Sequence, residues 1–243
     1  MHLYFVLNHR EGLTLPIHYN HLLQATLYNS MEPQLANFLH NQGYSSNKRV
    51  FKLFAFSKLT GNFKLDQQTN TIKYGEVTKL TVSSPLDDVC QSLANELLLN
   101  PNLRLGQQRV IVDRIELKKY QISTKTIRVK TLSPIVVYST LLRPDGRKYT
   151  CYFQAGEPMY NELITNNLRK KYNALFGAEP PDGEVSIKSI GPTKMRINKY
   201  KNFIIKGYEG KFVLTGPEEL LQLSVDCGLG SKNSQGFGCI EII

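Results

Sequence analysis

Hydrophobic and polar positions recur with two different periods along the first half of the chain, and their order predicts a sheet with helices packed on it. Short apolar and β-branched runs predict strands, whereas apolar residues three or four positions apart predict helices. We expect strands at residues 3–8, 51–57, 71–83, 103–105 and 109–118, and helices at 19–31, 34–41 and from Ser84 to Asn100. With the first two helices forming a hairpin, the order strand, helix, strand, strand, helix, strand predicts a ferredoxin-like unit.

Residues typical of helix ends support these boundaries. Pro33 suits the first turn of the second helix, and Gly43 suits the position just after it. Ser84 is expected to cap the following helix, with Pro85 at its first position and Asp87 in the first turn, where the helix dipole favours a carboxylate.

The second half of the chain repeats the same order of elements less clearly. Strands are expected at 126–132, 135–141, 185–190, 194–197, 203–206, 211–214 and 239–243, with a helix at 158–176 and a last helix that begins at Pro217. We therefore predict an α+β fold of two tandem ferredoxin-like (βαββαβ, RRM-like) domains, residues 1–120 and 121–243. This repeat is inferred from the order of elements and not from residue identity.

A glycine-rich loop precedes the last expected strand, and its composition suits an anion. Four glycines leave the backbone amides open to close approach, because no Cβ stands in the way. The spacing matches neither a Walker-type phosphate loop nor a dinucleotide-binding turn. An ordinary tight turn is the alternative. The candidate phosphate-binding residues are Gly228, Gly230, Ser231, Lys232, Asn233, Ser234, Gly236 and Gly238.

The charge balance favours a polyanionic partner. The chain of 243 residues has 30 Lys and Arg against 20 Asp and Glu, a net charge of +10 and a pI near 9.4. Both halves are basic, so no single tail explains the excess. A merely basic enzyme or a ribosome-associated protein is the alternative to a nucleic-acid partner.

Other compositional signals are weaker. No apolar run reaches the roughly 20 residues of a membrane span, and a cytoplasmic protein is expected. Cys90, Cys151, Cys227 and Cys239 are scattered without zinc spacing, so reduced thiols are expected and no metal or cofactor is implied.

Several motifs resemble one family of RNA-binding proteins. A loop of the form G-x-G-x-x-x-x-x-G-F-G before the last strand is similar to the hallmark of the repeat-associated (RAMP) proteins of CRISPR systems. The Tyr28-Asn29 pair, His40 on the next helix, the 52–54 strand and the segment 131–135 resemble the pre-crRNA-processing endoribonuclease (Cas six) of that superfamily. The resemblance extends over nearly the whole chain.

This resemblance implies metal-independent cleavage within the repeats of precursor crRNA. A 2′-hydroxyl would attack the adjacent phosphate and leave a 2′,3′-cyclic phosphate and a 5′-hydroxyl, so DNA would not be cut. His40 is the candidate acid or base, because imidazole titrates near neutral pH. Tyr28 is the candidate base or orienting group, and Lys52 the candidate cation. Lys48 is a less favoured cation, and His18 and His21 are reserves for His40.

RNA binding draws on a second basic stretch besides the glycine loop. Lys194, Arg196, Lys199 and Lys201 are spaced along an expected hairpin with Tyr200 and Phe203. Lysines can contact phosphates, and aromatic rings can stack on bases. An exposed hairpin with ordinary lysines is the alternative.

Two functions share these RNA-binding features. The first is the endoribonuclease; the second is a non-catalytic RNA-binding subunit of a CRISPR ribonucleoprotein complex. An unrelated metabolic enzyme would need a cofactor or metal motif, which the sequence does not show. The expected partners are CRISPR repeat RNA and other effector-complex subunits, in a monomer or homodimer without a membrane contact.

Overall fold

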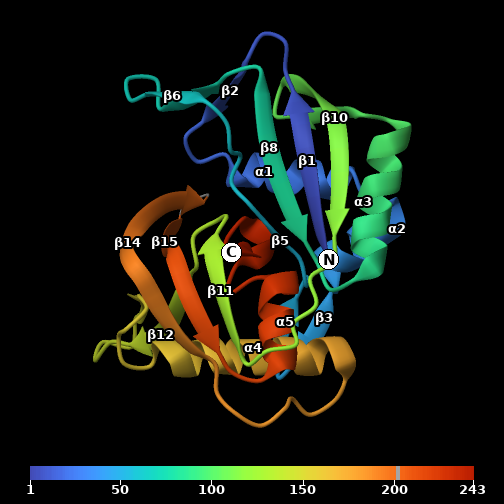
Figure 1. Ribbon diagram of the computed structural model, residues 1–243. Helices are drawn as coiled ribbons and strands as arrows, with labels where there is room; N and C mark the ends of the chain where they lie inside the picture. The colour runs from blue at the N-terminus through green and yellow to red at the C-terminus, as the bar shows by residue number, and fades with distance from the viewer. Residues whose placement is uncertain (201–202) are drawn as a thin grey trace.

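Strand β1 (His2–Asn8) lies at the centre of the first sheet in the computed structural model, which describes residues 1–200 and 203–243 (Figure 1). It pairs antiparallel with β8 (Val77–Ser83) on one side and with β10 (Gln108–Lys118) on the other. β5 (Ala55–Phe56) borders β8, and β9 (Asn102–Leu105) borders β10. Without β9, the strands follow the ferredoxin-like order 2-3-1-4.

The second sheet has the same order. β11 (Thr126–Thr131) lies between β15 (Phe203–Thr215) and β16 (Ile240–Ile242), and β14 (Ser186–Tyr200) lies at the edge beside β15. All of these pairs are antiparallel. Two ferredoxin-like sheets therefore occur in tandem, and the predicted fold is confirmed.

Amphipathic helices supply the apolar side chains that cover each sheet. α1 (Asn20–Asn29), α2 (Pro33–Asn41) and α3 (Asp87–Leu99) contribute to the core of the first sheet. α4 (Tyr160–Phe176) and α5 (Glu218–Cys227) contribute to the core of the second. Gly177, with φ of 63°, ends α4 in the left-handed conformation that glycine tolerates best. The helices predicted from periodicity thus form close to their expected positions.

The predicted strand at 51–57 is wrong, because the chain turns sharply inside it. Leu53 has φ of 52°, a left-handed conformation that interrupts a strand. β4 (Arg49–Phe51) pairs with β3 (Tyr44–Ser46), whereas β5 joins the main sheet. Lys52 therefore lies in the link between two sheets and not on a strand.

Two other boundaries differ from the sequence predictions. The expected strand at 71–83 is two strands, because β7 (Thr71–Tyr74) joins β2 (Leu13–Pro16) and β6 (Phe63–Asp66) in a small separate sheet. Ser84 does not cap α3, which begins only at Asp87. The Ser84 hydroxyl is buried; it donates to the Leu53 carbonyl and accepts from the Leu86 amide.

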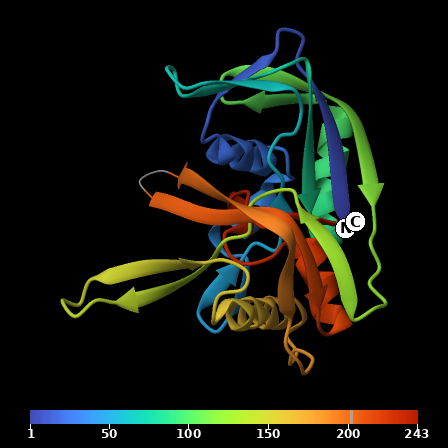
Figure 2. The same ribbon diagram turned by 60° about the vertical axis from the view of Figure 1, so that its left-hand side comes forward.

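Two hairpins extend from the second domain. The four strand pieces expected between 185 and 214 are one long hairpin of β14 and β15, with a register shift between Ile190 and Lys194. A second hairpin pairs β12 (Val137–Leu142) with β13 (Lys148–Phe153). The sequence pattern predicted β12 but not β13. Figure 2 shows this second hairpin projecting away from both sheets, and the β14–β15 hairpin reaching toward α1.

Buried and partly buried polar contacts join the two domains. The Ser133 hydroxyl donates to the Phe56 carbonyl at 2.9 Å and accepts from the Cys239 amide at 3.0 Å. The Tyr4 hydroxyl donates to Glu241 Oε1 at 2.9 Å. These contacts fix the final strand of the second domain against the first, and they place the glycine-rich loop between the domains.

Candidate functional site

Tyr28, His40 and Lys52 come together on one side of the first domain. The Tyr28 and His40 rings meet edge to face, with centroids 5.6 Å apart and planes at 83°. Lys52 Nζ donates to the backbone carbonyl of His40 at 2.9 Å. The three residues come from the last turns of α1 and α2 and from the link after β4, so the helical hairpin and the turn at Leu53 together create the cluster.

The His40 ring is exposed at the end of α2 and is held by a neighbouring amide. Its Nδ1 lies 2.8 Å from Asn41 Oδ1, and Asn41 Nδ2 donates in turn to Asn37 Oδ1 at 2.5 Å. In the tautomer with the proton on Nδ1, Nε2 offers a free lone pair to a substrate. Sequence reasoning did not identify Asn41 as the residue that orients His40; its position directly after a candidate histidine was the available signal.

The half-buried Tyr28 hydroxyl is better suited to donate a hydrogen bond than to remove a proton. Burial raises the pKa of Tyr28 to about 12, so the phenol stays neutral over the physiological range. Its ring also packs edge to face on Phe54, at 5.6 Å between centroids. Of the two roles expected from the sequence, this environment favours the orienting one.

Lys52 is half-buried, and desolvation by burial lowers the pKa of its ammonium group. Its hydrogen bond to the His40 carbonyl uses one of its three N–H groups, which leaves two for an anion. Lys48, the less favoured cation, is exposed in the turn between β3 and β4, with φ of 64°.

The two reserve histidines lie apart from this cluster, at the other end of α1. His18 Nδ1 is 2.9 Å from Asn198 Oδ1 on the β14–β15 hairpin, and His21 Nδ1 is 3.1 Å from the His18 carbonyl. Tyr200 from the same hairpin donates to Gln24 Oε1 at 2.6 Å. These contacts hold the hairpin against α1.

The glycines of the loop are buried, and neighbouring protein atoms fill the space where a Cβ would lie. A Cβ on Gly236, which has φ of 84°, would lie 2.6 Å from the Phe56 ring and 2.7 Å from Asn20 Nδ2. A Cβ on Gly238, with φ of 71°, would lie 2.0 Å from the Leu229 carbonyl. These glycines, with Gly228 and Gly230, allow the loop to pack tightly between the domains.

Interior hydrogen bonds hold the shape of the loop. The buried Asn233 side chain donates to the carbonyls of Leu229 and Phe237 at 3.0 and 3.1 Å, so its amide nitrogen points inward and not toward a ligand. The Lys171 ammonium, from α4, donates to the carbonyls of Gly228 and Gly230 at 2.7 and 3.1 Å. Asn233 was predicted to bind RNA; its amide nitrogen is occupied by the loop, while the residue also lines the pocket described below, so its contact with RNA stays a prediction.

The part of the loop that remains accessible lines a cavity of about 480 Å³ together with Lys52, and we name this cavity the basic pocket. Its charged lining residues are all cationic: Arg49, Lys52, Lys171 and Lys232. The loop contributes six consecutive residues to it, Gly230, Ser231, Lys232, Asn233, Ser234 and Gln235. Lys52, the proposed cation of the first domain, therefore shares one cavity with loop residues of the second domain. The sequence did not predict this, because the two segments are far apart along the chain.

A second hollow continues from the basic pocket and is rich in aromatic rings; we name it the aromatic groove. It measures about 690 Å³ and shares Tyr138, Thr140 and Lys232 with the basic pocket. Lys232 Nζ lies 5.6 Å from the centroid of the Tyr138 ring. The lining includes Lys148, Tyr149, Tyr152, Phe203, Lys206 and Tyr208. Sequence reasoning missed the contribution of β13, although Tyr149, Thr150 and Tyr152, residues that favour strands, were the available signal.

The predicted basic residues on β14 divide between two situations. Arg196 Nε donates to Glu209 Oε2 at 2.7 Å, and Glu209 also forms an ion pair with Lys58, so Arg196 already has a carboxylate partner. Lys194 and Lys199 are exposed. Lys201 lies outside the described residues. The expected basic stretch is therefore weaker at Arg196 than the sequence implied.

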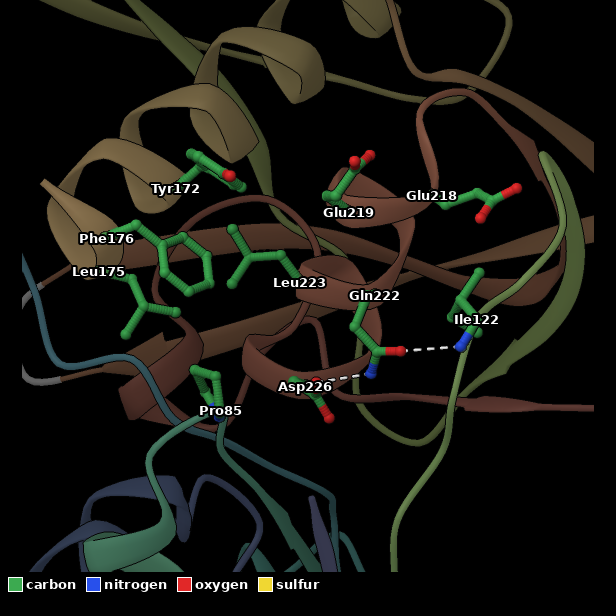
Figure 3. Close-up of a pocket in the computed structure, with 10 residues that line it drawn as sticks. All are labelled: Pro85, Ile122, Tyr172, Leu175, Phe176, Glu218, Glu219, Gln222, Leu223 and Asp226. Atoms are coloured by element: carbon green, nitrogen blue, oxygen red, sulfur yellow. Dashed lines mark hydrogen bonds between the residues drawn. The ribbon is translucent and has the colours of Figure 1, made fainter. Parts of the chain in front are cut away.

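A third hollow lies between α4 and α5 and has the opposite charge. It measures about 320 Å³ and is lined by apolar side chains from α4, among them Phe176, and by Glu218, Glu219 and Asp226 from α5 (Figure 3). Gln222 is hydrogen-bonded both to the Ile122 amide and to Asp226. Three carboxylates repel phosphate, so this hollow is not a candidate RNA site.

Two further observations concern only the residues that the structure describes, 1–200 and 203–243. Within these ranges, no group of three or more His, Cys, Asp or Glu side chains is arranged to hold a metal ion. No helix there is both long and apolar enough to cross a membrane.

The fold and the site together define the class of protein to which the chain belongs. Two tandem ferredoxin-like domains, with the glycine-rich loop of the second packed between them beside a basic pocket, form a two-domain α+β protein with a cationic site. A family model described as "CRISPR associated protein Cas6, C-terminal" matches residues 116–242, and one described as "CRISPR-associated protein Cas6, N-terminal" matches residues 14–116. The chain belongs to the Cas6 family.

Individual relatives agree with this assignment. The chain is 27% identical over 234 residues to "CRISPR-associated endoribonuclease Cas6 1" of Methanocaldococcus jannaschii, which covers 93% of this chain and 86% of the relative. It is also 27% identical over 243 residues to "CRISPR-associated endoribonuclease Cas6" of Pyrococcus furiosus, covering 96% and 85%. A solved structure titled "Characterization of a Cas6-related gene from Pyrococcus furiosus" has a TM-score of 0.85 at 21% identity, covering 100% of this chain and 98% of the other.

Proposed function

We propose that the protein is an endoribonuclease that matures CRISPR RNA by cutting once within each repeat of precursor crRNA, without a metal ion. The observation that carries this proposal is the grouping of Tyr28, His40 and Lys52 beside a pocket that Lys52 shares with the glycine-rich loop. Two relatives named as Cas6 endoribonucleases, each aligned over more than nine-tenths of this chain, support the substrate class.

The reaction needs only groups that move protons and stabilise negative charge. The 2′-oxygen forms a bond to the adjacent phosphorus while the bond from phosphorus to the 5′-oxygen breaks, which leaves a 2′,3′-cyclic phosphate and a 5′-hydroxyl. The proton leaves the 2′-oxygen, and the departing 5′-oxygen gains one. A positioned acid or base typically contributes about 10² to 10⁴ in rate, and fixed positive charge on the phosphorane adds to this.

The three residues fit these needs in different roles. His40 Nε2, exposed and oriented through Asn41, exchanges the proton with a reacting oxygen. Lys52, with free N–H groups at the edge of the basic pocket, stabilises the charge on the phosphorane. Tyr28 donates a hydrogen bond that orients the reacting ribose or phosphate, because its raised pKa keeps it neutral.

RNA binding is the task of the surface beside this cluster. Ser231, Lys232 and Ser234 in the basic pocket contact the phosphates, and rings of the aromatic groove stack on unpaired bases. Lys194 and Lys199 extend the positive charge along the hairpin. The buried glycines and Asn233 support binding by holding the loop in shape.

The test is cleavage of a labelled RNA that carries two or more repeats, comparing the wild type with His40→Ala. We expect His40→Ala to cut at least about 10² more slowly, and to bind the RNA within about twofold of the wild type. His21→Ala is the matched control, because His21 is an exposed histidine on the neighbouring helix, and it should cut normally. Normal cutting by His40→Ala would overturn the assignment of His40. RNA binding without cutting by the wild type would instead indicate a non-catalytic RNA-binding subunit.

A further inference from the structure

Helix α1 carries Tyr28 and is also hydrogen-bonded to the second domain. The Tyr200 hydroxyl, from the β14–β15 hairpin, donates to Gln24 Oε1 at 2.6 Å. Asn20, the first residue of α1, donates from Nδ2 to two carbonyls of the glycine-rich loop, at 2.9 and 3.2 Å. The helix is therefore held both by the hairpin, which reaches toward it in Figure 2, and by the loop. These are the two elements of the second domain to which RNA binding is assigned.

The contact with the hairpin lies beside Tyr28. Gln24 and Tyr28 are four positions apart in α1, and side chains at this spacing lie one above the other on the same face of a helix. Burial is the main cause of the raised pKa of Tyr28, and the phenol of Tyr200 raises it further. Both observations place Tyr200 close to the cluster of Tyr28, His40 and Lys52.

The position of the Tyr28 hydroxyl depends on the position of α1. Edge-to-face packing on His40 and Phe54 holds the ring, and among the described residues no hydrogen bond holds the hydroxyl. A group that orients a substrate must be placed to within about 0.5 Å, and a misplacement of about 1 Å can cost up to about 10² in rate. A hydrogen bond that fixes α1 one turn before Tyr28 therefore bears on the reaction.

We propose that Tyr200 is a positioning residue for the cleavage reaction, and that its hydrogen bond to Gln24 fixes α1 and thereby places the Tyr28 hydroxyl. This inference rests on the proposed function, because it requires Tyr28 to orient the reacting group. The β14–β15 hairpin then has two tasks. Lys194 and Lys199 supply positive charge for the RNA, and Tyr200 links the hairpin to the cluster in the first domain.

The experiment removes the Tyr200 hydroxyl and measures cutting and binding separately. Tyr200→Phe keeps the aromatic ring, so any stacking on a base is retained. The contact between His18 and Asn198 also stays in place, so the hairpin remains against α1. We expect the single-turnover cleavage rate to fall about fivefold, the effect of one lost hydrogen bond. The Kd for repeat RNA with a 2′-deoxy nucleotide at the cut position should stay within about twofold of the wild type.

The same substitution in a Tyr28→Phe background shows whether Tyr200 acts through Tyr28. If it does, adding Tyr200→Phe to Tyr28→Phe should slow cutting by less than about twofold, because the hydroxyl that Tyr200 positions is already absent. A general effect on folding would give the same fall in both backgrounds. The proposal is overturned if Tyr200→Phe cuts at the wild-type rate, or if its effect is as large in the Tyr28→Phe protein. Normal cutting by Tyr28→Phe alone would overturn the role given to Tyr28 in the proposed function, and this inference with it.

Two further variants complete the comparison. Gln24→Met removes the acceptor from the other side of the contact, and it should slow cutting as Tyr200→Phe does, with no further loss when the two are combined. Tyr172→Phe is the control, because Tyr172 lines the hollow between α4 and α5 and, among the described residues, its hydroxyl forms no hydrogen bond. It should cut at the wild-type rate. Additive effects of Gln24→Met and Tyr200→Phe would contradict a role for their shared hydrogen bond.

Discussion

Replacement of Lys171 by methionine tests whether the glycine-rich loop is held in shape from α4. The Lys171 side chain is 2% exposed, and its ammonium group donates to the carbonyls of Gly228 and Gly230. Burial lowers the pKa of this ammonium group, which reports the cost of removing it from water. Lys171→Met keeps most of the aliphatic stem and removes the two hydrogen bonds.

The magnitude follows from these contacts. A hydrogen bond to a charged group contributes about 1.5–3 kcal/mol, and each carbonyl left unpaired in the interior costs about 1–3 kcal/mol. The variant no longer buries an ammonium group, and this desolvation cost of several kcal/mol in the wild type offsets part of the lost stability. We therefore expect Lys171→Met to lower the free energy of unfolding by about 2 kcal/mol, or the melting temperature by about 4–8 °C for a chain of this length.

Denaturant unfolding and RNA cleavage, measured on the same preparations, check this prediction. The loop of Lys171→Met should lose its fixed position beside Lys52, so that repeat RNA is bound more weakly and cut more slowly while the chain still folds. Lys170→Met is the control, because Lys170 adjoins Lys171 on the same helix and, among the described residues, forms no hydrogen bond with the loop. An unfolding midpoint for Lys171→Met equal to that of the wild type would refute the role given to Lys171.

Two other predictions follow from shifted pKa values. Tyr28→Phe should slow cleavage by about tenfold. The shape of the cleavage-rate profile between pH 6 and 9 should not change, because a phenol with a pKa of about 12 does not titrate in this range. Loss of the basic limb of the profile in Tyr28→Phe would contradict the orienting role. Burial alone would raise the pKa of Glu241, but hydrogen bonds from Lys130 and Tyr4 outweigh burial and hold the pKa below its usual value of 4.5. Its contribution to stability is therefore complete above pH 4.5 and is lost as the pH falls through the folded-state pKa. Glu241→Gln should melt below the wild type at pH 7, with the gap closing in acid; a gap independent of pH would contradict the ionic contribution.

Local patterns were sufficient to predict the architecture. Helical periodicity, Gly177 at the end of α4 and acidic residues at the start of α3 and α5 depend on neighbours within a few positions, so the double ferredoxin-like order could be predicted from sequence. The turn at Leu53 could not, because a leucine with positive φ has no sequence signal and is stabilised by tertiary packing. The strand expected at 51–57 failed for that reason.

The candidate site was predictable only in part, because its parts meet through long-range contacts. Tyr28, His40 and Lys52 were identified through a family resemblance, and the structure brings them together. The glycine-rich loop looked like a phosphate cradle because its composition says nothing of Asn20, Phe56 and Lys171, which fill the space around it from distant segments.

The central claim, cleavage by attack of a 2′-hydroxyl, is tested most directly by a single substitution in the RNA. The cut position is first mapped on a repeat-containing RNA in the presence of EDTA, and the nucleotide immediately 5′ of the cut is then replaced by its 2′-deoxy form. We predict one cut per repeat in the unmodified RNA, ending in a 2′,3′-cyclic phosphate and a 5′-hydroxyl, and no cut at the modified position although binding persists. Cutting at the 2′-deoxy position, or products with a 5′-phosphate, would contradict the account.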